Sequence, residues 1–372
     1  MMIPDNLRWR RGVFWLAVFA TAIIIGSIIF LVSGIYNVAA SARHFGATES
    51  VINFLLARSV STYSAGVEAP DEFREGQARL GAVHFRYGCV PCHGSPAEQG
   101  SPVVANMYPA PPDLKTAAYE WDREELFWIV RHGLKFSGMP SWAGAGRDDE
   151  VWPLVAFLEA LPGMSVAEYR RLTGSADNPP HKPLGLMRGP SDLVDYCTAC
   201  HGGGDRPASD LVPSLEGQKP AYLRRALSEY SRNERQSGFM EPVAVELTES
   251  DIDRLVDHFS ARRPPAGHTA DPQAVARGRR IASQGIADQQ VPACLSCHGR
   301  EEAAQFPRLD GLQAGYIESQ LELWRQGGRD QTVYGRIMAA IAPRLTPGQA
   351  ADVAAYFSAG VEPSPRPEAR TP

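Results

Sequence analysis

The strongest constraint on this chain is a pentad, Cys-x-x-Cys-His, which occurs three times and uses all six cysteines. The copies are Cys89-Val-Pro-Cys92-His93, Cys197-Thr-Ala-Cys200-His201 and Cys294-Leu-Ser-Cys297-His298. Each copy places two thiols and an imidazole within a single turn of chain. This order and spacing would recur if each copy binds a group that needs two thiol attachments and one nitrogen ligand from the same short segment.

The order and spacing of the pentad are those of the covalent attachment site for haem c. The two thiols add to the vinyl groups of the flat macrocycle, and the adjacent imidazole reaches the iron from the same side. We therefore expect three haem c groups, with His93, His201 and His298 as iron ligands. The thioether bonds are expected at Cys89, Cys92, Cys197, Cys200, Cys294 and Cys297.

Other uses of paired cysteines fit the sequence less well. A structural zinc site needs four ligands, and no further cysteine remains to complete one. A redox dithiol of the thioredoxin kind needs a βαβ context, which none of the three copies shows. A disulfide framework is not needed by large helical units of this kind. The haem reading is therefore preferred for all three pentads.

The length of 372 residues suits two or three globular domains behind a membrane segment. Pro-rich stretches mark the boundaries, at Asn178-Pro179-Pro180 and at Arg263-Pro264-Pro265. We expect three cytochrome c domains, named here unit one (71–172), unit two (189–263) and unit three (272–362). The remaining segments are a cytoplasmic N-terminus (1–11), a transmembrane anchor (12–35), a juxtamembrane helix and linker (36–70), two linkers (173–188 and 264–271) and a disordered tail (363–372).

An uncharged, mostly apolar run extends from Gly12 to Ile35. As a helix it would span roughly 36 Å, enough to cross a bilayer core. Arginines precede the run, and no charge follows until Arg43, so the N-terminus is expected in the cytoplasm and the rest in the periplasm of a bacterial inner membrane. Ala40-Ser41-Ala42 resembles a signal-peptide cleavage site, but the run is too long for a signal peptide. We expect an uncleaved, single-pass anchor.

The pattern after the anchor predicts helices throughout and no strand, hence an all-α fold. Apolar residues recur with helical spacing over 49–65. This segment is expected to be either a juxtamembrane helix or a docking surface for a membrane partner. Further on, Asp122 with Glu125 indicates a capped helix start, as do Asp148, Thr248 and Thr346. The net charge of −5 gives no sign of a nucleic-acid partner.

Units two and three repeat each other. Pro213-Ser-Leu-Glu-Gly217 matches Pro307-Arg-Leu-Asp-Gly311, and Tyr222 matches Tyr316, at one constant offset. At a second, slightly larger offset, Met240 matches Met338, Leu247-Thr248 matches Leu345-Thr346, and Phe259 matches Phe357. The chain therefore carries two tandem copies of one fold.

The sixth iron position decides between an electron carrier and a reactive haem, because carriers close it with a second protein ligand. Each unit offers a methionine before its last predicted helix: Met139, Met240 and Met338. We expect these three as the second ligands. Methionine is commonly core filler, and Met107 lies too soon after its pentad to wrap round the ring. Among the other histidines, His84 is the least implausible alternative ligand, while His132 and His258 are expected to pack or face solvent.

The pentads, the later methionines and the terminal aromatic-bearing helices together resemble class I c-type cytochromes over about 71–362. Residues 189–362 resemble diheme cytochromes of the c-four kind. The resemblance implies that a proline carbonyl orients each pentad histidine, at Pro213 in unit two and Pro307 in unit three. In unit one the matching residue is Pro109, Pro111 or Pro112. Gly81 and Phe85 match the first helix of class I domains, whereas the first helix of unit two looks abbreviated at Gly189-Pro190.

The resemblance implies an electron carrier and not an enzyme. It predicts electron transfer in a bacterial respiratory chain towards a haem–copper terminal oxidase, with a quinol-oxidising complex or a dehydrogenase as donor. The alternative is an electron-accepting cytochrome subunit of a membrane-bound dehydrogenase complex. A haem peroxidase would need an open or bis-histidine site, against which a methionine in each unit argues. The expected partners are redox proteins and, through the anchor, membrane lipid, with no small-molecule substrate.

Overall fold

The computed structural model describes residues 5–39, 41–74, 76–173, 190–202, 207, 209–300 and 302–360. Over these residues the chain is helical and forms no strand, with one isolated bridge between Ile286 and Val291. The all-α prediction is therefore confirmed for the described part of the chain. The predicted tail (363–372) and nearly all of the predicted linker 173–188 lie outside the described residues.

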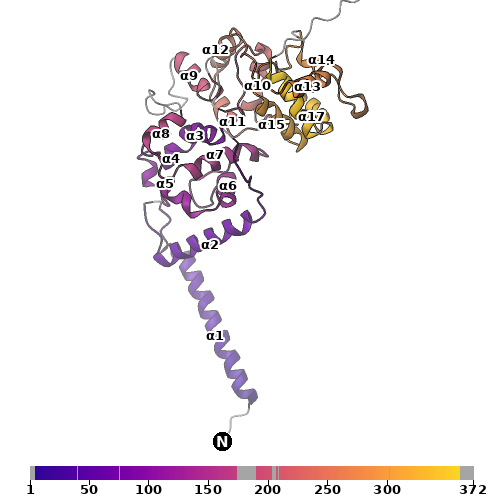
Figure 1. Ribbon diagram of the computed structural model, residues 1–372. Helices are drawn as coiled ribbons and strands as arrows, with labels where there is room; N and C mark the ends of the chain where they lie inside the picture. Colours follow the sequence, from indigo (N-terminus) through magenta and orange to yellow (C-terminus); the bar gives the residue numbers. More distant parts are fainter. Residues whose placement is uncertain are drawn as a thin grey trace, which may run out of the picture.

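The first helix, α1 (Asp5–Val32), projects away from the rest of the chain (Figure 1). Its stretch Trp9–Val32 has a mean hydropathy of 2.6 and is long and apolar enough to cross a membrane. The helix ends three residues before the apolar run does, and Gly34 follows with a φ of +64°. A positive φ is tolerated by glycine and stops a right-handed helix.

The second helix, α2 (Gly46–Ser64), confirms the helix expected over 49–65. Its C-terminal half packs on unit one, where Val60 and Ser64 are buried and Tyr63 stacks on Trp128, with ring centroids 6.0 Å apart. Its N-terminal half leaves Phe54 and Leu55 exposed. The helix therefore packs on unit one through one half and keeps an apolar face uncovered on the other.

The buried side chains of the described residues form three separate hydrophobic clusters, one each within units one, two and three. The α-helices of unit one are α3 (Gln77–Gly88), α4 (Val90–His93), α5 (Leu114–Ala117), α6 (Arg123–His132), α7 (Asp148–Ala160) and α8 (Val166–Leu172). Those of unit two are α9 (Pro190–His201), α10 (Pro220–Ser231), α11 (Met240–Ala244) and α12 (Glu249–Ser260). Unit three contains α13 (Pro272–Gln284), α14 (Leu295–His298), α15 (Ala314–Arg325), α16 (Val333–Ile341) and α17 (Pro347–Ser358).

Three of the four predicted caps are present. Asp122 with Glu125 forms a capping box at the start of α6, and Thr248 and Thr346 do the same at α12 and α17. A capping box satisfies the free N–H groups of the first helical turn. Asp148 is the first residue of α7, but the N-cap position there is Arg147 and makes no side-chain cap bond, so the cap expected at this start is absent. Polar side chains therefore set the starts of α6, α12 and α17, as their sequence pattern indicates.

The repeat of units two and three is visible in their hydrogen bonds. Gly217 donates its backbone N–H to the carbonyl of Phe259, and Gly311 donates in the same way to Phe357, both at 2.8 Å. Gly217 and Gly311 have φ angles of +64° and +78°. The two Pro-x-Leu-x-Gly segments thus end in the same left-handed turn, held on the last helix of each unit.

In units one and three the first helix crosses a later helix in close contact, α3 with α7 and α13 with α17. A Cβ on Gly81 of α3 would lie 1.9 Å from the carbonyl oxygen of Pro153 in α7, and a Cβ on Gly278 of α13 would lie 1.9 Å from that of Asp352 in α17. Only glycine allows backbones to approach so closely. In unit two, α9 begins at Pro190 and contacts α12 far less extensively, as its abbreviated sequence indicates.

Replacing Gly278 with alanine is expected to destabilise unit three by about 1–3 kcal/mol, because the added methyl overlaps the opposing backbone. Gly348, on α17, meets nothing within 4 Å and has no positive φ. Gly348→Ala is therefore the matched control and should change the stability by less than about 1 kcal/mol. Urea unfolding followed by far-ultraviolet circular dichroism measures both, and equal midpoints would contradict the tight crossing.

Candidate functional site

Each pentad contains a helical turn whose last residue is the histidine, and in units one and three this turn is a separate four-residue helix. The backbone N–H of His93 donates to the carbonyl of Cys89 at 2.9 Å, and that of His298 donates to Cys294 at 3.0 Å. In unit two the pentad is the last turn of α9. In a helix, residues three apart share a face, so the two thiols of each pentad lie on one side of the turn. None of the six cysteines forms a disulfide.

Each pentad histidine is held by a proline carbonyl. The Nδ1 atom lies 3.0 Å from the carbonyl oxygen of Pro112 for His93, 2.8 Å from that of Pro213 for His201 and 2.9 Å from that of Pro307 for His298. A carbonyl only accepts, so Nδ1 carries the proton and Nε2 keeps a free lone pair. The contacts agree with the expected roles of Pro213 and Pro307, and in unit one they select Pro112 from the three candidates.

Several pentad side chains are withdrawn from solvent, whereas Cys92 is exposed. Burial raises the pKa of the Cys89, Cys197 and Cys200 thiols to about 12 and that of Cys294 to about 11. A redox dithiol needs the opposite shift, because the thiolate is the reactive form. Burial also lowers the pKa of His201 and His298, which favours the neutral imidazole that binds a metal.

The expected ligand Met139 lies in the loop between α6 and α7. Its backbone N–H donates to the Ser137 hydroxyl at 3.1 Å, and that hydroxyl donates to the Leu134 carbonyl at 2.7 Å. The methyl group of Met107 packs against Gly138. Met107 thus lies beside this loop although it follows the pentad closely in sequence, a proximity that spacing alone did not predict.

The other two expected ligands differ in their local structure. Met240 is the first residue of α11 and follows the loop 237–239. Met338 lies inside α16 and packs on the same hydrophobic cluster as Cys294. The two residues match in sequence, but the helix that contains Met338 starts earlier, capped by Thr332.

The methionine loops of units one and two face each other. Gly238 lies against the Trp142 ring so closely that a Cβ would be 2.1 Å from it, and the Trp142 and Phe239 ring centroids are 5.4 Å apart. His84 joins this contact, with its ring 4.5 Å from that of Phe239 and 5.0 Å from that of Trp142. Burial lowers the pKa of His84 to about 3 and keeps it neutral. His84 therefore packs between the two units.

A buried ion pair accompanies these rings. Glu150 of α7 is only 5% exposed, and its carboxylate pairs with Arg147 at 2.7 Å. It also accepts hydrogen bonds from the Ser237 hydroxyl at 2.7 Å and from the Gly238 N–H at 2.6 Å. Burial raises the pKa of Glu150, and the Arg147 guanidinium lowers it. The sequence offered no signal for this contact, because the partners lie in different units.

Units two and three meet at a buried cluster of arginine and tyrosine. Arg235 lies over the Tyr230 ring at 4.6 Å and donates to the Tyr222 hydroxyl at 3.3 Å. Burial lowers the pKa of Arg329, and the nearby positive charge of Arg235 lowers it further. Arg235 and Arg329 are separated by the same offset as Tyr222 and Tyr316. Sequence reasoning missed this cluster, although the matching positions of Arg235 and Arg329 in the repeat were a signal that could have indicated it.

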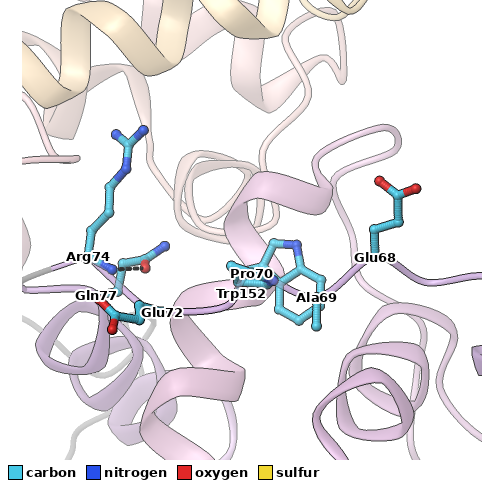
Figure 2. Close-up of a pocket in the computed structure, with 7 residues that line it drawn as sticks. All are labelled: Glu68, Ala69, Pro70, Glu72, Arg74, Gln77 and Trp152. Carbon is cyan, nitrogen blue, oxygen red and sulfur yellow. Dashed lines mark hydrogen bonds between the residues drawn. The ribbon is translucent and has the colours of Figure 1, made fainter.

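A surface pocket of about 370 Å³ lies elsewhere, between the chain entering unit one and α7. Figure 2 shows its lining, in which Trp152 and Pro70 lie between Glu68 and Arg74. The backbone N–H of Arg74 donates to the Gln77 side chain at 2.7 Å (Figure 2). The pocket contains no pentad residue and no expected methionine ligand, so it is separate from the candidate site.

Part of unit one matches a known protein family. Residues 76–158 match the family described as cytochrome c oxidase, cbb3-type, subunit III. Among solved structures, Acidithiobacillus ferrooxidans cytochrome c4 is 36% identical and covers 44% of this chain and 98% of its own, with a TM-score of 0.40.

Curated relatives cover half of the chain or somewhat less. Cytochrome c-552 of Acidithiobacillus ferridurans is 37% identical over 193 residues, which are 50% of this chain and 78% of that protein. The thiosulfate dehydrogenase electron acceptor of Thiomonas intermedia is 32% identical over 44% of this chain and 77% of its own. Cytochrome c4 of Thiocapsa roseopersicina is 32% identical over 43% of this chain and 85% of its own. The chain therefore belongs to the c-type cytochromes, which bind haem c covalently, and part of it resembles the diheme cytochromes c4.

Proposed function

We propose that this protein carries three haem c groups in series and transfers electrons, one at a time, in a bacterial respiratory chain towards a haem–copper terminal oxidase. The observation that supports this most strongly is the threefold recurrence of one arrangement. Each pentad contains a helical turn that ends at its histidine, and each pentad histidine is hydrogen-bonded through Nδ1 to a proline carbonyl.

This arrangement prepares the histidines as iron ligands. The proline carbonyl fixes the tautomer and the ring orientation, and it raises the basicity of Nε2. His93, His201 and His298 then each present a neutral nitrogen beside two thiols. The cysteines Cys89, Cys92, Cys197, Cys200, Cys294 and Cys297 would form the thioether bonds.

Buried hydrogen-bond donors at the contacts between units also fit a haem group. Arg235 Nε and Trp142 Nε1 are buried and have no hydrogen-bond partner among the described residues. Buried polar atoms are normally paired, and a haem carries two propionates that accept hydrogen bonds. The arginine and tyrosine cluster between units two and three therefore suits the negatively charged edge of a haem.

Met139, Met240 and Met338 are proposed as the second iron ligands. Histidine–methionine coordination raises the reduction potential of a haem, because the soft thioether favours Fe(II). Three closed sites suit the transfer of electrons and leave no open position for a substrate. We therefore propose a carrier and not an enzyme in its own right.

The helix α1 is proposed as a single-pass anchor in the bacterial inner membrane. The arginines before the apolar run support a cytoplasmic N-terminus by the positive-inside rule. The three units would then lie in the periplasm, where haem c is attached to proteins of this kind.

A second candidate is an electron-accepting subunit of a membrane-bound dehydrogenase complex. The match of residues 76–158 to an oxidase subunit family favours the first function. The similarity to a thiosulfate dehydrogenase electron acceptor favours the second. Both candidates require the same redox sites and differ only in the partner.

The partner is tested by purifying the tagged full chain from its native membrane in mild detergent. The first function predicts that a haem–copper oxidase co-purifies and oxidises the reduced protein. The second predicts a dehydrogenase subunit whose substrate reduces the haems. Recovery of the dehydrogenase without the oxidase would overturn the preferred function.

The double substitution Cys294→Ala with Cys297→Ala is expected to remove one haem of three and to destabilise unit three. The macrocycle would form much of that unit's core, so its loss removes buried apolar contacts. Pyridine haemochrome absorbance per mole of protein measures the stoichiometry. The proposal of a haem in unit three fails if the stoichiometry stays unchanged.

Met139→Ala is expected to leave one haem high-spin and able to bind carbon monoxide, because it opens one iron position. Met107→Ala is the matched control, because Met107 lies beside the same loop and is expected to leave all haems low-spin. Optical spectra with and without carbon monoxide measure both variants. A fully low-spin spectrum for Met139→Ala would rule out this ligand, and a high-spin haem in Met107→Ala would transfer the role to Met107.

A further inference from the structure

The loop that carries Met240 is held by a side chain from another unit. The Met240 backbone N–H donates to the Ser237 hydroxyl at 3.1 Å, and that hydroxyl donates to the Glu150 carboxylate at 2.7 Å. The other carboxylate oxygen accepts from the Gly238 N–H at 2.6 Å. Two hydrogen bonds in series therefore connect Glu150 of unit one to the backbone of Met240 in unit two.

The corresponding loop of unit one is supported from within. The Met139 N–H also donates to a serine hydroxyl, that of Ser137, but this hydroxyl donates to the Leu134 carbonyl of the same unit. In unit three, Met338 lies inside α16, whose start is capped by Thr332. Of the three methionine segments, that of unit two has its serine hydroxyl bonded to a neighbouring unit.

The support from Glu150 is itself rigid. Arg147 pairs with Glu150 at 2.7 Å and with Asp149 at 2.9 Å, and it donates to the Gln236 carbonyl at 2.7 Å. Both Arg147 and Glu150 are buried, so water competes little for their bonds. Every group that faces the carboxylate oxygens in these contacts is a donor, as a carboxylate requires.

The backbones of the two loops also touch directly. A Cβ on Gly144 would lie 2.5 Å from the Gly238 nitrogen, and a Cβ on Gly238 would overlap the Trp142 ring. Neither position has room for a side chain. The two loops are therefore held in one relative position by backbone contact as well as by the buried ion pair.

We propose that Glu150 is a positioning residue supplied by unit one to the second haem site, where it acts through Ser237 to hold Met240 in place for the iron. This inference rests on the proposed role of Met240 as a ligand. It means that the second haem keeps its methionine ligand, and with it a high potential, only while units one and two are docked. The contact between units one and two would then set both the electron transfer between the first two haems and the reduction potential of the second haem.

The test uses the full chain with its haems attached, in detergent, and measures how tightly imidazole displaces the methionine from each ferric haem. Loss of an outer-shell partner weakens a metal ligand by about 10- to 100-fold. Glu150→Ala should therefore raise the imidazole affinity of one haem by about that factor and leave the other two unchanged. A redox titration should show one potential lowered and two unchanged, because histidine–methionine coordination raises the potential.

Ser237→Ala keeps the inference testable if Glu150→Ala fails to fold because Arg147 is left buried without its partner. It removes the intermediate hydroxyl without leaving a charge unpaired, and it should affect the same haem in the same direction. Glu159→Ala is the matched control. Glu159 lies on the same helix and pairs with Arg123 at 2.7 Å, within unit one, so its loss should change no imidazole affinity.

Met240→Ala distinguishes a wrong assignment of Met240 as the iron ligand from a wrong positioning role for Glu150. If Met240→Ala changes none of the haems, the ligand assignment itself is wrong. If it opens one haem that Glu150→Ala and Ser237→Ala leave unchanged, only the positioning role is overturned. If the role is right, Glu150→Ala has no further effect on that haem in a Met240→Ala background, because the two residues act in one chain.

Discussion

The bond between each pentad histidine and a proline carbonyl is the contact on which the proposed chemistry depends. An imidazole can bind a metal through either nitrogen, and the carbonyl removes this ambiguity by accepting a hydrogen bond from Nδ1–H, which keeps the proton on Nδ1 and leaves Nε2 free. The carbonyl belongs to a later segment of the same unit, 19 residues after His93, 12 after His201 and 9 after His298. The loop that returns to the pentad therefore has a chemical as well as a structural role.

The three units have separate hydrophobic cores, so their cooperation depends on the two joints between them. The joint of units two and three is built from equivalent residues of a repeat, with Arg235 and Arg329 among tyrosines. The joint of units one and two has no such symmetry. It combines an aromatic contact with the buried pair of Arg147 and Glu150. The two contacts that electrons would cross therefore differ in chemistry, which gives each proposed haem its own surroundings.

Much of the fold followed from local patterns. Capping residues set the starts of α6, α12 and α17 as their sequences indicate, since a helix start depends on nearby polar side chains. The end of α1 did not follow from the apolar run, because hydropathy sets where a helix is stable in lipid and not where the backbone turns. The choice of Pro112 over its neighbours also needed the structure, because three candidate prolines lie within four residues of one another.

The amino-acid sequence by itself determined the chemistry of the site, because two thiols and an imidazole must come from one turn of chain and their spacing is therefore local. It also determined the repeat, the helical class and the apolar segment at the N-terminus. Only the tertiary structure decided which groups meet across units. Glu150 lies far from Ser237 in the chain, and no periodicity or spacing connects them. Contacts of this kind depend on how separately folded units dock. The docking geometry is determined by the unit surfaces, which form only after the helices have packed.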